Sequence, residues 1–382
     1  MTLNLNDGHL FGGTGADVFP GRPAPWRGPL VEVDRLETDD PQDVLAFVDA
    51  LGLGGPPDSH RGELAVGLLL GARGCAVLGD VPRPQASPVA KIPECVAVVY
   101  RRGEARATPL GTASTGPWRT TWTDEEHAAA VQAVREAIER GEVYQANVVG
   151  HRSAPCSGDP RALAAAVAQL PGATYGGVVS GEGWVVASAS PEQLVRVEGV
   201  TLSTVPIKGT AAARDVLQAS AKDRAEHVMI VDLERNDVAR VAQTGSVAVE
   251  DLYALSQWSG LWHASSTVTG RLAPGAGTVD VLAALLPGGS VTGAPKHAAC
   301  ALLAALEPVG RGPAMGAMGF LWPGGLDLGL TIRTVAIVDG RVHLWAGGGI
   351  TWGSDPATEV AEAHAKAAPV QAALAQVRPA SS

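Results

Sequence analysis

Short apolar runs separated by Gly- and Pro-containing segments fill the first third of the chain. The runs Leu64 to Leu70 and Cys95 to Tyr100 consist almost entirely of apolar residues. Runs of this length between turn residues are typical of buried strands. We therefore expect strands with irregular connections over residues 30–115, where the pattern is the least regular of the chain.

A helical period follows this region. The segment Thr123 to Glu126 has the spacing of a capping box, and Val131, Val134 and Ile138 then mark one face of a helix. Gly141 is a natural C-terminal stop for this helix. Similar patterns predict further helices over 224–239, 294–306 and 355–376.

Strand patterns lie between these helices. Two apolar segments, 328–338 and 341–346, flank the pair Asp339-Gly340, which is a strong signal of a two-residue hairpin turn. Further strands are predicted over 143–149, 184–190 and 193–205, with a turn at Glu198-Gly199 inside the last segment. Strands joined by hairpins, with helices between them, indicate an α+β fold built on antiparallel sheet.

Composition narrows the class of protein. The chain has 382 residues, of which 46% are hydrophobic and 18% are charged, so it can bury a large core as two or three average domains or as one large domain. The formal net charge is −10 and no long basic run occurs, which argues against nucleic acid as a partner. A membrane helix needs about 18 consecutive apolar residues, and because no such stretch occurs we expect no membrane span.

The cysteines and the first 29 residues bear on the cellular compartment. The four cysteines are scattered and form no CxxC pair, which is typical of free thiols in a reducing compartment. Residues 1–29 are rich in Gly, Pro and Asp and lack the apolar core of a signal peptide. We therefore expect a cytoplasmic protein.

Lys208 is the first candidate for chemistry. It stands between the apolar end of a predicted strand and Gly209. If its side chain faces a closed site, desolvation lowers its pKa and frees the amine to act as a nucleophile. The alternative is an ordinary strand-end lysine in contact with water.

Carboxylates on two predicted helices form a second candidate. Glu359, Glu362 and Lys366 are three and four residues apart, so they share one face of the last helix. Glu226 lies near the start of the helix over 224–239. Two carboxylates from distant helices suit Mg²⁺, which takes its remaining ligands from water and substrate. A solvated helix face with a Glu–Lys pair is the alternative.

Two glycine-rich segments and one arginine complete the candidates. Residues 287–296 form a glycine-rich loop that enters a helix, where exposed amides suit a carboxylate or phosphate, although a plain Gly-Pro turn fits equally well. Arg333 lies in the predicted strand 328–338, either at a sheet surface or paired with a carboxylate. The run Gly347-Gly348-Gly349 allows close approach of a ligand to the backbone, and a bulge is the alternative.

Nine motifs in register carry a resemblance to a known family. The match extends from about Trp118 to Leu374, with the motifs in order along it. They are Val143-Tyr144-Gln145-Ala146-Asn147, Ser190-Pro191-Glu192, Pro206-Ile207-Lys208-Gly209-Thr210, Glu226-His227-Val228-Met229 with Arg235-Asn236-Asp237, Trp262-His263-Ala264-Ser265-Ser266, Gly289 to Lys296, Ile332-Arg333-Thr334, Gly347-Gly348-Gly349-Ile350 and Glu359 to Lys366. Together they resemble the chorismate-utilising enzyme family, and within it the first components of aminodeoxychorismate synthases.

The resemblance implies a fold and a set of roles. The implied fold is α+β, with two packed antiparallel sheets flanked by helices and an active site in a cleft. Residues 116–376 match the catalytic region, and residues 1–115 form a short, divergent N-terminal region of the same fold. The implied metal is Mg²⁺, and its carboxylates match Glu226 and Glu362, with Glu359 as a near neighbour one turn earlier on the same helix. Substrate contacts match Gln145, Thr292, Gly293, Arg333, Gly348, Gly349 and Lys366, and catalytic groups match Lys208, Glu192 and His263.

Two positions divide the family. Members that add water to chorismate carry lysine where this chain has Gln145, and anthranilate synthases carry alanine where it has Lys208. The resemblance therefore implies amination of chorismate to 4-amino-4-deoxychorismate, in which Lys208 adds at C2 while Glu192 protonates the leaving C4 hydroxyl. Ammonia then attacks C4 and expels the lysine. The chain has no glutaminase motif, so the resemblance also implies a glutamine amidotransferase partner that supplies ammonia, in p-aminobenzoate and folate biosynthesis.

Three departures from the family pattern keep other functions open. Ala211 to Ala213 replace a basic loop motif, Phe320 stands where many relatives have tyrosine, and Trp352-Gly353 replaces a small-acidic pair. The alternatives are anthranilate synthesis, chorismate amination in secondary metabolism, and a regulatory subunit without enzyme activity.

Overall fold

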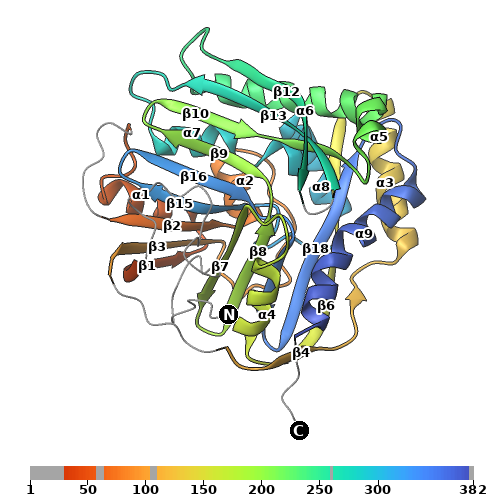
Figure 1. Cartoon of the computed structure of the whole chain (residues 1–382), viewed down its shortest axis with the longest axis horizontal. Helices are drawn as coiled ribbons and strands as arrows, with labels where there is room; N and C mark the ends of the chain where they lie inside the picture. The colour runs from red at the N-terminus through yellow and green to blue at the C-terminus, as the bar shows by residue number, and fades with distance from the viewer. Residues whose placement is uncertain (1–29, 57–63, 104–109, 259–260, 378–382) are drawn as a thin grey trace.

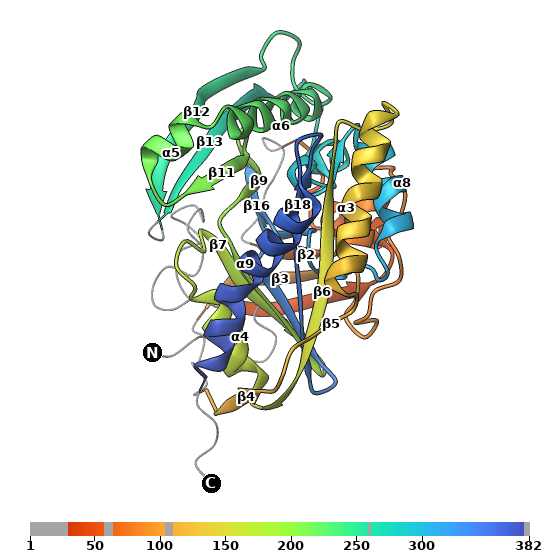
Figure 2. The same ribbon diagram turned by 90° about the vertical axis from the view of Figure 1, so that its right-hand side faces the viewer.

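The computed structural model describes residues 30–56, 64–103, 110–258 and 261–377. The expectation about residues 1–29 lies outside these ranges. Within them the chain forms two antiparallel sheets that pack together, with helices outside, as Figure 1 and Figure 2 show from two directions. The α+β fold predicted from the sequence is confirmed.

The larger sheet has ten strands among the described residues, in the order β1-β3-β2-β15-β16-β9-β10-β13-β11, with β12 paired to β13. The early apolar runs of the sequence form β2 and β3 in this sheet, as predicted. The strands are β1 (Leu30–Thr38), β2 (Ala65–Leu70), β3 (Cys95–Arg102), β9 (Gln193–Glu198), β10 (Thr201–Val205), β11 (Ile207–Ala211), β12 (Ala248–Trp258), β13 (Leu261–Arg271), β15 (Ala317–Trp322) and β16 (Gly325–Leu330).

The smaller sheet has eight strands in the described ranges, in the order β14-β6-β18-β17-β8-β7, with β4 and β5 paired to β6. The predicted hairpin is confirmed: Asp339 and Gly340, both with positive φ, join β17 to β18. The strands are β4 (Ala113–Thr115), β5 (Arg119–Thr120), β6 (Gln145–Gly158), β7 (Tyr175–Gly181), β8 (Trp184–Ser190), β14 (Gly293–Ala294), β17 (Thr334–Val338) and β18 (Arg341–Ile350).

The helices pack against the two sheets. Helices α3, α4, α8 and α9 contact the smaller sheet, and α6 contacts β10, β11 and β13 of the larger one. The predicted capping box opens α3, where Thr123 and Glu126 hydrogen-bond each other's backbone N–H groups. The helices are α1 (Pro41–Ala50), α2 (Ala72–Leu78), α3 (Asp124–Glu139), α4 (Pro160–Ala168), α5 (Arg214–Ala219), α6 (Ala221–Ala239), α7 (Thr278–Leu285), α8 (Lys296–Leu306) and α9 (Pro356–Ala375), with a 3₁₀ turn over Gly289–Val291.

An apolar layer joins the two sheets. Leu68 and Leu69 of β2, Val186 of β8 and Trp345 of β18 belong to one buried cluster. Burial of this extent is the main source of stability in a fold of this size. In the described part of the chain, no helix combines the length and the apolar character needed to cross a membrane.

Two of the passages of the chain between the sheets lie next to each other. After β8 it crosses to β9 through Pro191 and Glu192, and after β16 it crosses back to β17 through residues 331–333. The Ala189 N–H donates to Arg333 O over 3.1 Å, and the Leu330 N–H donates to Glu192 O over 3.1 Å. Backbone hydrogen bonds therefore hold the two crossovers side by side.

One predicted strand is wrong at the second crossover. Residues 328–338 do not form a single strand, because β16 ends at Leu330 and β17 begins at Thr334 in the other sheet. Arg333 lies between them with φ 50°, in the left-handed region that non-glycine residues rarely adopt. Both strands are buried along their whole length, and residues 331–333 contain no glycine or proline that would mark a break between them.

Candidate active site

Lys208, on the edge strand β11, reaches the junction of the two sheets. Its Nζ donates to the Ser290 carbonyl over 3.3 Å, in the 3₁₀ turn that precedes β14. A Cβ added to Gly349 of β18 would lie 3.5 Å from the same Nζ. Burial lowers the pKa of the Lys208 amine, and the Glu192 carboxylate opposes that shift. The amine is therefore shielded by the protein, while the Lys208 residue as a whole is half-buried.

Glu192 lies beside this amine. It is 6% exposed, and its Oε1 accepts a long hydrogen bond, 3.5 Å, from the Ile207 N–H. Burial raises the pKa of the Glu192 carboxyl, while Lys208 and the Ser290 side chain oppose the shift. Burial thus favours a protonated acid next to an unprotonated amine, which are the forms that a general acid and a nucleophile need.

Gln145 and the glycine run form the wall opposite Lys208. Strand β18 pairs with β6 without any register shift from Arg341 to Ile350, so the run is regular strand and the alternative of a bulge is wrong. A Cβ on Gly349 would lie 2.3 Å from Gln145 Nε2, so glycine is what lets the Gln145 amide occupy this place. Gln145 is 1% exposed, and its Oε1 has no hydrogen-bond partner among the described residues. That oxygen is available to a bound ligand.

Two of the predicted metal carboxylates face the same region. Glu226 of α6 and Glu359 of α9 both favour the charged form of the Lys208 amine. The Thr351 hydroxyl donates to Glu226 Oε1 over 3.2 Å, and the Ser354 hydroxyl donates to Glu359 Oε1 over 2.6 Å. Burial raises the pKa of the Glu226 carboxyl.

The third predicted carboxylate lies at the surface. Glu362 Oε2 is 3.6 Å from Lys366 Nζ, and both side chains are about half exposed. Lys366 also donates to Gly347 O over 3.1 Å, and its Nζ would be 3.1 Å from a Cβ on Gly348. Across the described ranges, no three His, Cys, Asp or Glu side chains gather closely enough to hold a metal ion. Mg²⁺ needs only one or two carboxylates, so Glu226 and Glu359 are a suitable donor set.

The predicted histidine supports the strand that carries Lys208. His263 of β13 is 3% exposed, and its Nδ1 lies 3.1 Å from the hydroxyl of Thr210, its neighbour across the sheet. Thr210 is two residues beyond Lys208 on β11. His263 thus lies across the sheet from the strand that carries Lys208.

The glycine-rich loop is buried as far as Ala294. Residues 287–294 are not exposed, and Gly293 pairs with Ala146 of β6. The Thr292 hydroxyl donates to Gly288 O over 2.8 Å, and the Asn147 N–H donates to Thr292 O over 2.8 Å. The start of the helix, from Pro295 on, is partly exposed. The loop supplies the Ser290 carbonyl to Lys208.

Sequence reasoning missed His227 as a support of the site. Its ring is fully buried, with Nδ1 3.3 Å from Lys208 O and Nε2 2.5 Å from the Ser266 hydroxyl. The Tyr253 N–H donates to that hydroxyl over 2.9 Å, so we assign the Ser266 proton to His227 Nε2 and the ring proton to Nδ1. His227 then donates to the backbone of Lys208. The sequence signal for this role was its place directly after Glu226.

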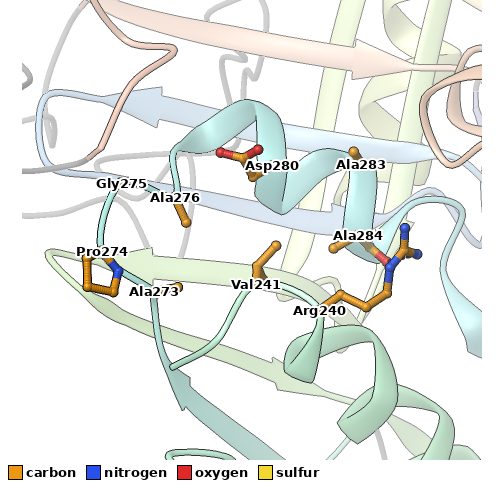
Figure 3. Close-up of a pocket in the computed structure, with 9 residues that line it drawn as sticks. All are labelled: Arg240, Val241, Ala273, Pro274, Gly275, Ala276, Asp280, Ala283 and Ala284. Carbon is orange, nitrogen blue, oxygen red and sulfur yellow. Dashed lines mark hydrogen bonds between the residues drawn. The ribbon is translucent and has the colours of Figure 1, made fainter. Parts of the chain in front are cut away.

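A separate pocket lies away from these residues. This pocket has a volume of about 440 Å³. Figure 3 shows Arg240, at the end of α6, and Asp280 of α7 among the small side chains that line it. None of the predicted site residues in the described ranges belongs to its lining. The candidate site is therefore defined by the sheet junction and not by this cavity.

Curated proteins similar to this chain carry two different names. It is 40% identical over 270 residues to anthranilate synthase component 1 of Streptomyces coelicolor, which covers 68% of this chain and 53% of that protein. It is 36% identical over 263 residues to aminodeoxychorismate synthase component 1 of Escherichia coli, covering 66% of this chain and 58% of that protein. The chain thus spans somewhat more than half the length of these relatives.

A solved structure and a family match support the fold and the family. Anthranilate synthase component I of Streptococcus pneumoniae superposes with a TM-score of 0.77 at 24% identity, over 90% of this chain and 91% of that one. The family described as chorismate binding enzyme matches residues 74–372, a stretch that includes every predicted site residue. Since this match covers most of the sequence, the chain belongs to the family of chorismate binding enzymes.

Proposed function

We propose that this protein aminates chorismate to 4-amino-4-deoxychorismate. The observation that carries the proposal is the contact geometry of Lys208, whose half-buried side chain places its amine against the Ser290 carbonyl and next to Glu192. An amine whose pKa is lowered by burial, beside a carboxyl whose pKa is raised by burial, is suited to nucleophilic attack coupled to protonation of a leaving group. By family resemblance, anthranilate synthases carry alanine at this position and have no such amine.

The reaction takes two allylic displacements. The Lys208 amine bonds to C2, the ring double bond shifts, and the C4–O bond breaks as Glu192 gives its proton to the leaving hydroxyl. The nitrogen of ammonia then bonds to C4, the double bond shifts back, and the C2–N bond breaks to return the Lys208 amine. Glu192 regains its proton from the new ammonium group, so protons balance over the cycle.

Other residues at the junction bind the reactants. Mg²⁺, if held by Glu226 and Glu359, supplies a positive charge to a substrate carboxylate. Lys366, beside Gly348, suits the same carboxylate. The buried Gln145 Oε1, which has no partner among the described residues, is an acceptor for an ammonia N–H. An amidotransferase partner would deliver that ammonia, because the chain has no glutaminase motif.

Anthranilate synthesis is the second candidate, because proteins of that name reach 40% identity to this chain. It requires direct addition of ammonia at C2 followed by loss of pyruvate. In that reaction Lys208 would have no covalent role.

Product identity tests the proposal. The protein is incubated with chorismate, Mg²⁺ and ammonium, and the product mass is read with and without an added aminodeoxychorismate lyase. We expect a product with the mass of aminodeoxychorismate, which becomes aromatic only with the lyase. Direct appearance of fluorescent anthranilate would support the second candidate. Tight binding of an amidotransferase without any turnover would instead indicate a regulatory subunit.

A further inference from the structure

Glu234 of α6 is a buried carboxyl to which the proposed reaction gives no role. It is 3% exposed, and its Oε2 accepts a hydrogen bond from the Thr204 hydroxyl of β10 over 3.3 Å. A Cβ added to Gly289 would lie 3.2 Å from its Oε1. The Glu234 carboxyl therefore lies between the end of β10 and the 3₁₀ turn that contains Ser290.

The same two segments of the chain hold Glu192. Its Oε1 accepts a hydrogen bond from the Ile207 N–H, shortly after β10, and its carboxyl also forms a hydrogen bond with the Ser290 side chain of the turn. The two carboxyls are close enough for the charge of Glu192 to act on Glu234. Glu234 thus lies behind the candidate general acid, and Lys208 lies in front of it.

The charged groups around Glu234 make its ionisation difficult. Burial raises the pKa of the Glu234 carboxyl, the charges of Asp237 and Glu192 add to this shift, and Lys296 opposes it. Lys296 is already paired with Asp237, with 2.7 Å between Nζ and Oδ2. Two carboxyls that lie together in a buried site resist ionising at the same time, so one proton stays with the pair.

We propose that Glu234 is a positioning residue for the general acid, because it shares one proton with Glu192 and so keeps that proton available to the leaving C4 hydroxyl. Glu192 gives the proton to the hydroxyl, which leaves as water, while the Lys208 nitrogen bonds to C2 and becomes positive. The new negative and positive charges offset each other, and the product ammonium group later returns the proton. The role of Glu192 as the acid rests on the proposed function, whereas the sharing of a proton does not.

Sharing extends the pH range in which Glu192 is protonated. In Glu234→Gln, which keeps the shape and the acceptor oxygen, Glu192 titrates alone and loses its proton at a lower pH. Turnover should therefore reach its optimum roughly one pH unit lower than in the wild type, with a smaller maximum. A purely structural loss would lower turnover by the same factor at every pH. Product formation is measured across neutral and alkaline pH, with the concentration of free ammonia held constant.

Carbon-13 NMR of the full chain, labelled at the glutamate carboxyls, measures the sharing without substrate. The signals of Glu192 and Glu234 are each assigned by their absence from the corresponding Glu→Gln variant. In the wild type the last proton of the pair should be lost at a higher pH than in either single variant, by roughly one pH unit or more. The reason is that each variant removes the negative charge that opposes ionisation of the other carboxyl.

Glu94→Gln is the matched control. Burial also raises the pKa of Glu94, which lies directly before β3 and forms hydrogen bonds with the backbone of α2. Its loss should change neither the titration of Glu192 and Glu234 nor the pH optimum of turnover. The inference would be overturned if Glu192→Gln left the titration of Glu234 unchanged, or if Glu234→Gln left the pH optimum in place.

The two measurements separate this inference from the proposed function. If the titrations of Glu192 and Glu234 are coupled and no chorismate is aminated, the shared proton stands and the amination proposal falls. If amination proceeds and the two carboxyls titrate independently, the shared proton falls and the amination proposal stands.

Discussion

Two buried regions of the molecule differ in the kind of side chain they contain. One is the apolar layer between the two sheets, and the other is the junction where the chain crosses from one sheet to the other. The layer contains apolar side chains such as Leu69 and Val186, on strands with regular pairing. The junction contains Glu192, Lys208 and the left-handed Arg333, on segments where strands end. In the layer, burial stabilises the fold. At the junction, burial opposes ionisation: it raises the pKa of the Glu192 carboxyl and lowers the pKa of the Lys208 amine.

The two regions therefore have different roles: the layer determines the stability of the fold, and the junction provides the groups for chemistry. Burial of an ionisable group costs free energy, so the apolar layer, and not the junction, supplies the stability that holds the junction residues in place. Substitutions at the junction should therefore change activity far more than stability. Substitutions in the layer should do the opposite.

The largest effect is expected for Lys208→Ala. Without the amine no C2 adduct forms, and we expect aminodeoxychorismate formation to fall by about 10³-fold or more. The melting temperature should not fall, because the variant removes a buried ionisable group. Product formation and thermal unfolding are measured on the same samples. The control is Lys91→Ala, at an exposed lysine paired with Asp339, which should change neither.

Leu69→Ala is expected to have a smaller effect, on stability and not on activity. This side chain is fully buried in the layer, and its truncation should lower the free energy of unfolding by about 2–5 kcal/mol. Turnover per folded molecule should stay near the wild-type value. Denaturant unfolding and active-site-normalised kinetics measure the two quantities. A large loss of turnover in the folded fraction would show that layer and junction are not independent.

The smallest effect is the pH dependence of stability that comes from two buried histidines beside Trp345 of the apolar layer. His151 and His343 contact each other over 3.1 Å, and burial lowers their pKa values to about 3 and about 4. Below about pH 6.5 these histidines bind protons in the unfolded chain. In the folded chain they stay neutral until the pH approaches 4. Stability should therefore be complete above pH 6.5 and fall as the pH drops toward 4, by about 1–2 kcal/mol per histidine at pH 5.

His343→Gln tests this pH dependence. The variant removes one titrating group, so its free energy of unfolding should fall less steeply than that of the wild type between pH 7 and pH 5. Unfolding by urea at several pH values measures the slopes. Equal slopes would contradict the role of the histidine pair.

Much of the fold was predictable because its signals are local. The capping box at Thr123, the turn at Asp339-Gly340 and the strands on either side of Glu198-Gly199 were all found where the sequence predicts them. The second crossover was not predictable, because the strands on both sides of it are fully buried and residues 331–333 contain no glycine or proline. Period and turn signals do not reveal which sheet a fully buried strand joins.

The candidate site was predictable only as a set of residue types. Family resemblance identified Lys208 and Glu192, but not the Ser290 carbonyl that meets the amine or the His227 ring that holds its backbone. These contacts join residues that are 82 and 19 positions apart in the chain. Such pairs depend on how α6, β11 and the loop before β14 pack, and local patterns do not encode that packing.

Mapping a covalent adduct tests the central claim most directly. The protein is mixed with chorismate and Mg²⁺ without ammonia, quenched in acid, digested, and examined by peptide mass spectrometry. We predict a mass increase equal to chorismate minus one water on the peptide that contains Lys208, and its disappearance when ammonium is added before the quench. Aminodeoxychorismate formation without any adduct on Lys208, or with an adduct on another residue, would contradict the account.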